Sequence, residues 1–322
     1  MHKPVFWVSS TLLLLSTLFH SAILFAQSEP PSQTPASQIP AKPKGTEVAA
    51  TVGNHDILVS TVQKFVEARV PQRNLSPERL RHVQAEALEH LVRRAVIADY
   101  LASKKKWAGD NEVRLELDKL EQQLKRAESS IEEHLKENEV TMAQLEFEAA
   151  WRMSWQKYLA ATLTDQNLQT FYDSRRHEFD GSEMKVAHLL IKHGSTSSSD
   201  LSEIHASLKE SPTKWNELVK QHSEAASRNE AGVVGWIGFE GPMPPAFTEA
   251  AFRLKVGEIS EPVETVFGKH LIRCLEVRKG KIGMMDARVA VIQKAKSFLF
   301  FKLSKDHRPK VNVTYTDRWP HH

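Results

Sequence analysis

Two histidines set in apolar stretches are the side chains of this 322-residue chain best suited to chemistry in a dry site. His188 lies within the apolar run 184–191, and His270 opens the run 270–277. Thr265 stands shortly before His270, and its hydroxyl can hydrogen-bond to that ring. A histidine on an apolar strand is more often a hydrogen-bonded core residue than a catalyst, and two together could form half of a metal site. No further Cys, Asp or Glu is arranged to complete a metal shell, so we predict no metal and no cofactor.

A proline-rich segment, residues 241–252, lies between these two runs. Its Met243 and Phe247 could belong to an ordinary hydrophobic core. The prolines that surround them favour a loop at the lip of a pocket instead. The chain has no G-x-S-x-G, Walker, G-x-G-x-x-G or H-E-x-x-H motif, so nothing supports a hydrolase, a nucleotide-dependent enzyme or a zinc protease.

Two apolar strands must carry the histidines, one over 184–191 and one over 270–277. Between them we expect two short amphipathic helices and a turn at Gly232–Gly235. A further helix is expected to begin near Pro245 and to project the rings of Phe247 and Phe252 together.

This order of pieces resembles the parvulin family of peptidyl-prolyl cis–trans isomerases. His188 stands where the family has the histidine of its first strand. Thr265 and His270 match the family's Thr-x-x-x-x-His, and the segment 254–263 matches its L-x-x-G-x-x-S-x-P-V. Met243 and Phe247 match the Met-x-x-x-Phe of its proline pocket.

The resemblance implies an α+β fold in which a small antiparallel sheet flanked by helices occupies residues 182–278. It also implies that the two histidines meet at the floor of the sheet. The side chains that it implies are catalytic are His188, His270 and Thr265. Those that it implies bind substrate are Met243, Phe247, Val234, Phe252 and Ala225.

Isomerisation about an X–Pro bond requires little proton chemistry, because the barrier of ~18–20 kcal/mol comes from lost amide resonance. A catalyst therefore needs a dry pocket for the proline ring and one or two polar groups that stabilise the twisted amide. It needs no nucleophile.

One position departs from the family pattern. Ala225 stands where active parvulins carry Cys or Asp, and Val233-Val234 replaces the Asp-Leu of a Gly-Asp-Leu-Gly turn. The departure leaves two hypotheses open: an isomerase of reduced activity, or a holdase chaperone with a degenerate, non-catalytic or weakly catalytic parvulin domain. No arginine pair follows His193, so we expect no preference for phosphorylated Ser/Thr–Pro.

The front of the chain predicts export. Residues 1–26 have the short basic end and apolar run of a signal peptide, and the Pro-, Ser- and Gln-rich residues 27–45 indicate a disordered linker. We expect a periplasmic protein. The alternative is anchoring to the inner membrane by an uncleaved N-terminal segment, because the apolar run approaches the ~20 residues that span a bilayer.

Composition limits the remaining classes. A single cysteine, Cys274, excludes an intramolecular disulfide, and no Lys/Arg-dense block lies near aromatic residues, so we predict no nucleic-acid partner.

A helical region surrounds the parvulin-like stretch. We expect helices over much of 46–181, with starts at Ser76-Pro77 and Thr141, and a C-terminal helix and strand over 279–322 after a flexible joint at 279–283. Because a lone short strand is unstable, the strand at 310–315 is predicted to pair with 47–52.

This layout resembles the exported SurA/PrsA-like chaperone class, in which both ends of the chain form one chaperone core. The resemblance implies that the partners are unfolded or nascent exported polypeptides with Xaa-Pro bonds. The alternative is a helical spacer with no binding role.

Overall fold

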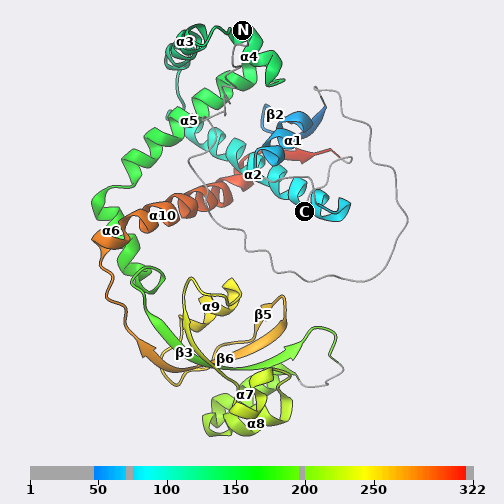
Figure 1. The fold of residues 1–322 in the computed structure, drawn as a ribbon, viewed down its shortest axis with the longest axis vertical. Coiled ribbons are helices and arrows are strands. Elements are labelled where there is room, and N and C mark those ends of the chain that lie inside the picture. The colour runs from blue at the N-terminus through cyan, green and yellow to red at the C-terminus, as the bar shows by residue number, and fades with distance from the viewer. Residues whose placement is uncertain (1–46, 70–74, 196–199, 317–322) are drawn as a thin grey trace, which may run out of the picture. The chain divides into compact units, whose positions relative to one another are not determined.

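The computed structural model describes residues 47–69, 75–195 and 200–316 (Figure 1). The chain divides into two compact units. The terminal unit joins residues up to 161 with residues from 296 onward, and the central unit comprises residues 162–295. The predicted signal peptide and linker lie outside the described residues.

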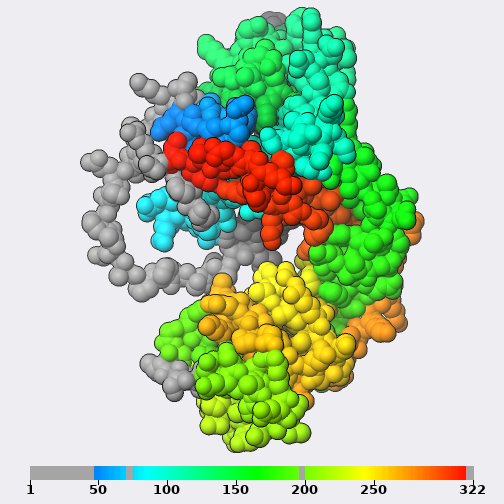
Figure 2. Space-filling model, turned by 180° about the vertical axis from the view of Figure 1, so that it is seen from behind, coloured from blue at the N-terminus to red at the C-terminus, as the bar shows by residue number. Residues whose placement is uncertain are grey.

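The two ends of the chain share one sheet in the terminal unit. Strand β1 (Val48–Val52) pairs antiparallel with β2 (His55–Leu58) on one side and with β7 (Val313–Tyr315) on the other. Figure 2 shows the red C-terminal part of the chain lying against the blue first strands. The predicted pairing of the ends is confirmed. Strand β7 is shorter than expected, because residues 308–310 form a 3-10 turn.

Helices account for most of the terminal unit. In chain order they are α1 (Val59–Glu67), α2 (Pro77–Ser103), α3 (Asp110–Arg126), α4 (Ile131–Glu137), α5 (Met142–Thr162) and the last part of α10 (Met284–His307). The predicted starts are confirmed by their caps: Ser76 Oγ accepts from the N–H of Arg79 at 3.2 Å, and Thr141 and Gln144 cap each other. The sequence reasoning missed α4, which has its own capping box at Ser130.

The core of the terminal unit lies between this sheet and the helices α1 and α2. It contains Ala49, Ala50 and Val62 at 0% exposure, together with Leu88 and Val92 of α2. Val313 and Tyr315 of β7 pack against the same cluster. The last strand therefore contributes side chains as well as hydrogen bonds to this core.

The central unit is built on a four-stranded antiparallel sheet. Its strands, in spatial order, are β4 (Val233–Gly238), β3 (Glu183–Lys192), β6 (Gly268–Arg278) and β5 (Val263–Thr265). Its helices are α6 (Asp165–Ser174), α7 (Leu201–Glu210), α8 (Trp215–His222), α9 (Pro245–Ala251) and the first part of α10 (Met284–His307). The predicted α+β class with a small antiparallel sheet is confirmed.

Alternation along β3 and β6 sends successive side chains to opposite faces of the sheet. Ala187 and Leu189 pack with α7 and α8, whereas Val186 and Ile272 pack with α9 (Figure 1). His188 is two residues from Val186 and therefore lies on the α9 face. In the register of β3 with β6, Leu190 is opposite His270.

The expected flexible joint at residues 279–283 is wrong. Its backbone is hydrogen-bonded: Gly280 N–H donates to Ser182 Oγ at 3.0 Å, and Ile282 N–H donates to the carbonyl of Asp180 at 3.0 Å. A Cβ on Gly280 would lie 1.9 Å from the Asp180 carbonyl oxygen, so the close approach requires glycine. The stretch is anchored to the chain that enters β3.

Helices α6 and α10 pack together beside this anchor. Leu168 and Tyr172 of α6 form a buried cluster with Val291 of α10, and the Tyr172 hydroxyl donates to the Ile282 carbonyl at 2.6 Å. None of the helices in the described ranges is long and apolar enough to cross a membrane.

Candidate functional site

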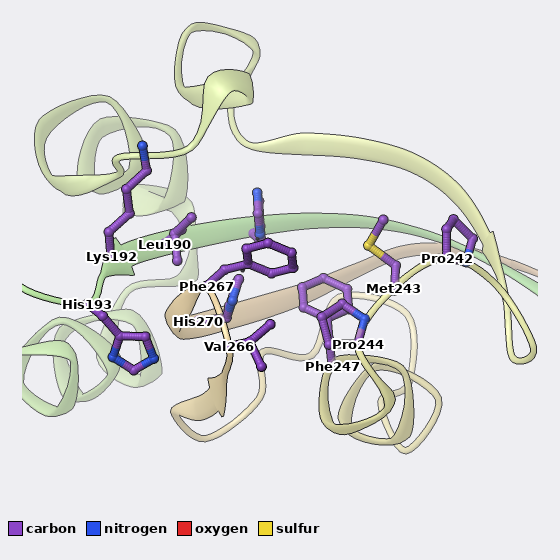
Figure 3. Close-up of a pocket in the computed structure, with 11 residues that line it drawn as sticks. Leu190, Lys192, His193, Pro242, Met243, Pro244, Phe247, Val266, Phe267 and His270 are labelled. Atoms are coloured by element: carbon purple, nitrogen blue, oxygen red, sulfur yellow. Dashed lines mark hydrogen bonds between the residues drawn. The ribbon is translucent and has the colours of Figure 1, made fainter. Parts of the chain in front are cut away.

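A cavity of about 570 Å³ opens on the α9 face of the central sheet (Figure 3). Strands β3 and β6 supply its floor, and the loop before α9 supplies one wall. The residues that line it are His188, Leu190, Lys192, His193, Pro242, Met243, Pro244, Phe247, Val266, Phe267 and His270. Four of the eight predicted site residues are among them: His188, His270, Met243 and Phe247.

The two histidines meet in the floor of this cavity. Their Nδ1 atoms are 3.1 Å apart and their rings are stacked with centroids 5.3 Å apart. The ring of Phe247 meets both edge-on, at 5.8 Å from His188 and 5.4 Å from His270. Thr265 lies behind His270, with its Oγ1 2.8 Å from Nε2 of that ring. The expected hydrogen bond between Thr265 and His270 is therefore present.

These contacts join the three side chains in one chain of hydrogen bonds. Thr265 Oγ1 donates to the Gly268 carbonyl at 3.3 Å and lies 2.8 Å from His270 Nε2. On the other side of that ring, His270 Nδ1 and His188 Nδ1 share one hydrogen bond, so one of these two nitrogens carries a proton and the other does not. The tautomer of one ring therefore determines that of the other.

Burial keeps both rings uncharged. It lowers the pKa of His188, and it lowers the pKa of His270 to about 4, with the neighbouring His188 and His193 as further causes. His270 is only 3% exposed. At neutral pH the pair is therefore a polar, uncharged floor that can hydrogen-bond.

The loop between β4 and α9 forms the apolar wall. Pro242, Met243 and Pro244 reach the cavity from this loop, and Phe247 reaches it from the first turn of α9 (Figure 3). Phe247 is 1% exposed, and Met243 packs against the same core cluster. The wall and the ring of Phe247 make an apolar recess directly above the histidines.

Sequence reasoning missed the opposite lip. Val266 and Phe267 form the turn of the β5–β6 hairpin and are 69% and 56% exposed, although both are large and apolar. The N–H of Phe267 donates to Thr265 Oγ1 at 3.1 Å, so the lip is tied to the histidine pair. The available signal was two bulky apolar residues at the tip of a hairpin, just before Gly268.

Three residues predicted to bind substrate do not line the cavity. Val234 and Phe252 pack into the core cluster behind the wall, where Phe252 is 8% exposed. Ala225 is half-buried just after α8, and its N–H donates to Ser223 Oγ at 3.3 Å. Their role in binding stays a prediction. Within the described ranges, no group of three or more His, Cys, Asp or Glu side chains is placed to hold a metal ion.

Residues 188–276 match the family described as Rotamase, the PPIC-type PPIASE domain. These residues are a parvulin-type peptidyl-prolyl isomerase domain. The predicted resemblance to parvulins is confirmed, and the paired histidines, Thr265 and the Met243–Phe247 recess all belong to this parvulin domain.

The relatives include proteins named PrsA and SurA, the class that the layout of this chain resembles. The chain is 31% identical over 116 residues to the foldase protein PrsA of Bacillus subtilis (strain 168), a match that covers 36% of each protein. It is 38% identical over 120 residues to the chaperone SurA of Methylobacillus flagellatus, covering 35% of this chain and 26% of the relative. A parvulin-like PPIase of Rickettsia conorii is 30% identical over 48% of this chain and 55% of its own length. The matches thus span between about a quarter and just over half of these relatives.

Solved structures of the same name are also similar. PrsA from Bacillus anthracis has 23% sequence identity and a TM-score of 0.34, over 69% of this chain and 96% of that one. One of the SurA-like chaperones PEB4 and Cj1289 of Campylobacter jejuni has 22% identity and a TM-score of 0.28, over 84% of this chain.

Proposed function

We propose that this chain is an exported peptidyl-prolyl cis–trans isomerase that also acts as a chaperone, assisting the folding of secreted or envelope proteins. Its substrates are unfolded segments with Xaa-Pro bonds. The observation that carries the proposal is the His188–His270 pair, held in an uncharged floor beneath the apolar recess of Met243 and Phe247.

The recess can bind the proline ring while the floor acts on the amide. Met243 and Phe247 exclude water from the ring, which strengthens every polar interaction inside the cavity. When the amide twists, its lone pair is localised on the prolyl nitrogen, which becomes a better hydrogen-bond acceptor. We place the proton of His188 on Nε2, which requires His270 to donate from Nδ1 to His188 and to accept from Thr265 at Nε2. A hydrogen bond from this Nε2–H to the prolyl nitrogen strengthens as the twist develops and so lowers the barrier.

A protease-coupled assay with an Xaa-Pro peptide tests the enzyme. We expect a catalysed rate above the spontaneous one for the folded full-length chain, and a loss of most of that rate in His188→Ala. A folded protein that does not accelerate isomerisation would remove the isomerase proposal.

A second candidate is binding without turnover, and Ala225 favours it because this position has no polar side chain. In this reading the cavity grips proline-containing or apolar segments and releases them unchanged. The same assay separates the two: a peptide that binds with no rate acceleration supports the holdase.

The chaperone core is proposed for residues 46–181 and 279–322, around a parvulin domain at 182–278. These limits extend past the terminal unit, which stops at 161 and resumes at 296. Deleting 182–278 and joining the ends with a short Gly-Ser linker should leave a folded protein that still suppresses aggregation of an unfolded client. A folded but inert remainder would leave only a helical spacer.

Export to the periplasm follows from residues 1–26. Cell fractionation and N-terminal sequencing of the mature protein test it, with Gln27 as the expected first residue. A membrane-bound protein that retains Met1 would instead support the uncleaved anchor.

A further inference from the structure

The cavity wall is a loop that cannot hold itself by backbone hydrogen bonds alone. It runs from Phe239 to Pro244, between β4 and α9. Pro242 and Pro244 have no amide N–H to donate. Side-chain contacts therefore contribute to the position of the loop, and with it to that of Met243 in the recess.

One of these contacts comes from outside the stretch that matches the isomerase family. His177 lies in the 3-10 turn Arg176–Glu178, between α6 and β3. Its ring is stacked on Phe252 with centroids 5.5 Å apart and is 5.3 Å from the ring of Phe239. Phe239 and Phe252 meet edge-on at 5.4 Å. The three rings form a closed cluster, which we call the ring clamp.

The ring clamp connects directly to the recess. Phe239 and Met243, the first and fifth residues of the loop, both pack against the buried cluster that contains Phe247 and Phe252. Holding Phe239 therefore restricts where Met243 and the two prolines can lie. Aromatic pairs of this kind have preferred geometries, so the clamp specifies an orientation as well as a contact.

A charged side chain supports the same loop. Lys294 Nζ lies 3.6 Å from Glu178 and 3.9 Å from Glu240, and over the ring of Phe239 at 5.8 Å from its centroid. Glu240 is the second residue of the loop. Lys294 is 44% exposed, so its ion pairs are weak and the rings carry most of the restraint.

We propose that His177 is a positioning residue of the site: it clamps Phe239 and Phe252 and so holds the Pro242–Pro244 wall at the distance that fits a proline ring. The inference rests on the proposed isomerase function. It means that the substrate recess depends on the segment between α6 and β3, which lies outside residues 188–276.

Two substitutions in the full-length chain test the proposal. His177→Ala removes the ring and should raise KM for an Xaa-Pro peptide about three- to tenfold while leaving kcat within about twofold, since the histidine floor is untouched. His177→Phe keeps a ring and should restore KM. A merely structural role would not give this separation of KM from kcat.

A second readout does not depend on activity. With 13C-methyl-labelled methionine, the Met243 methyl resonance, assigned by Met243→Leu, should shift or broaden in His177→Ala and return in His177→Phe. A wild type that does not accelerate isomerisation defeats the proposed function, whereas the Met243 signal still decides whether His177 holds the wall.

His205→Ala is the matched control. His205 is a buried histidine of the same unit, 4% exposed, on α7 at the other face of the sheet. The His205→Ala substitution should lower the melting temperature without changing KM or the Met243 resonance. The proposal is overturned if His177→Ala keeps both the wild-type KM and the wild-type Met243 signal. It is also overturned if His177→Phe is as impaired as His177→Ala, or if the loss in His177→Ala is confined to kcat.

Discussion

Thr265 and His270 are joined by a 2.8 Å hydrogen bond between the threonine hydroxyl and Nε2 of the ring. Both residues are buried, at 8% and 3% exposure. The 3.1 Å contact between the two rings couples the proton position of His188 to that of His270. A hydroxyl outside the cavity lining is therefore linked through His270 to both rings of the floor.

Replacing Thr265 by Val should lower kcat about tenfold, because the buried Nε2 of His270 loses its hydrogen-bond partner and the coupled proton positions of the two rings are disturbed. Thr265→Ser keeps the hydroxyl and should retain most of the rate. The measurement is kcat in the peptide assay, with melting curves to confirm folding. Equal rates in the valine and serine variants would show that the hydrogen bond has no catalytic role.

Acid should weaken the fold before it protonates the site. Burial lowers the pKa of His270 from 6.5 to about 4, so between these pH values the unfolded chain binds a proton that the folded chain does not. The free energy of unfolding is therefore not reduced by His270 above pH 6.5, and it decreases as the pH falls from 6.5 toward 4. Melting temperatures measured from pH 7 to 4 should fall less steeply for His270→Gln, which cannot protonate. Parallel curves for the two proteins would contradict this.

Phe267 should matter for substrate binding far more than for stability. It is 56% exposed and lies on the lip of the cavity, so Phe267→Ala should raise KM about threefold or more and leave the melting temperature nearly unchanged. Met285→Ala removes an equally apolar side chain, 81% exposed on α10, and is the control. If both variants keep the wild-type KM, the lip makes no contact with the peptide.

Ala225→Asp should raise the isomerase rate above wild type. The predicted effect is smaller than the ~2.7–4 kcal/mol typically lost when a preorganised polar group is removed, because the surrounding dipoles are not arranged for a new charge. Ala225→Asn, of similar size but uncharged, separates charge from shape. A folded aspartate variant without gain would place Ala225 outside the catalytic machinery, in keeping with its absence from the cavity lining.

Removing residues 309–322 should destabilise the terminal unit selectively. The deletion takes away β7 and Tyr315, whose hydroxyl donates to Glu89 at 2.8 Å. Hydrogen exchange should accelerate along β1 and α2, whereas protection of β3 and β6 should persist. Unchanged exchange in β1 would refute a core shared by the two ends of the chain.

The sequence predicted those features that depend on local pattern or on a linear motif. Caps at Ser76 and Thr141 and the two histidine strands are each encoded in a few adjacent residues. The pairing of the chain ends was predicted because each end holds one short strand that needs a partner. The contact between His188 and His270 could be predicted only from the match to the parvulin motifs, since a strand pattern does not say which strands are neighbours.

What was missed depends on partners distant in the chain. The stretch 279–283 contains two glycines and no apolar periodicity, and only the Asp180 carbonyl facing Gly280 shows why it is fixed. His177 lies in a polar segment with no motif, and its function is visible only beside Phe239 and Phe252. Helix α4 has seven residues, too few for a reliable apolar repeat.

The pairing of β1 with β7 also sets an order of events during synthesis. Every strand of the central sheet has been made by Arg278, so the cavity can form while α10 is still absent. Strand β1 is made first and can pair with β2, but it lacks its second neighbour, β7, until Tyr315 emerges. Until then its outer edge exposes unpaired backbone groups. The nascent chain therefore has its proline site before its terminal unit is complete, and for that interval one edge of its earliest strand is open to pairing with another segment.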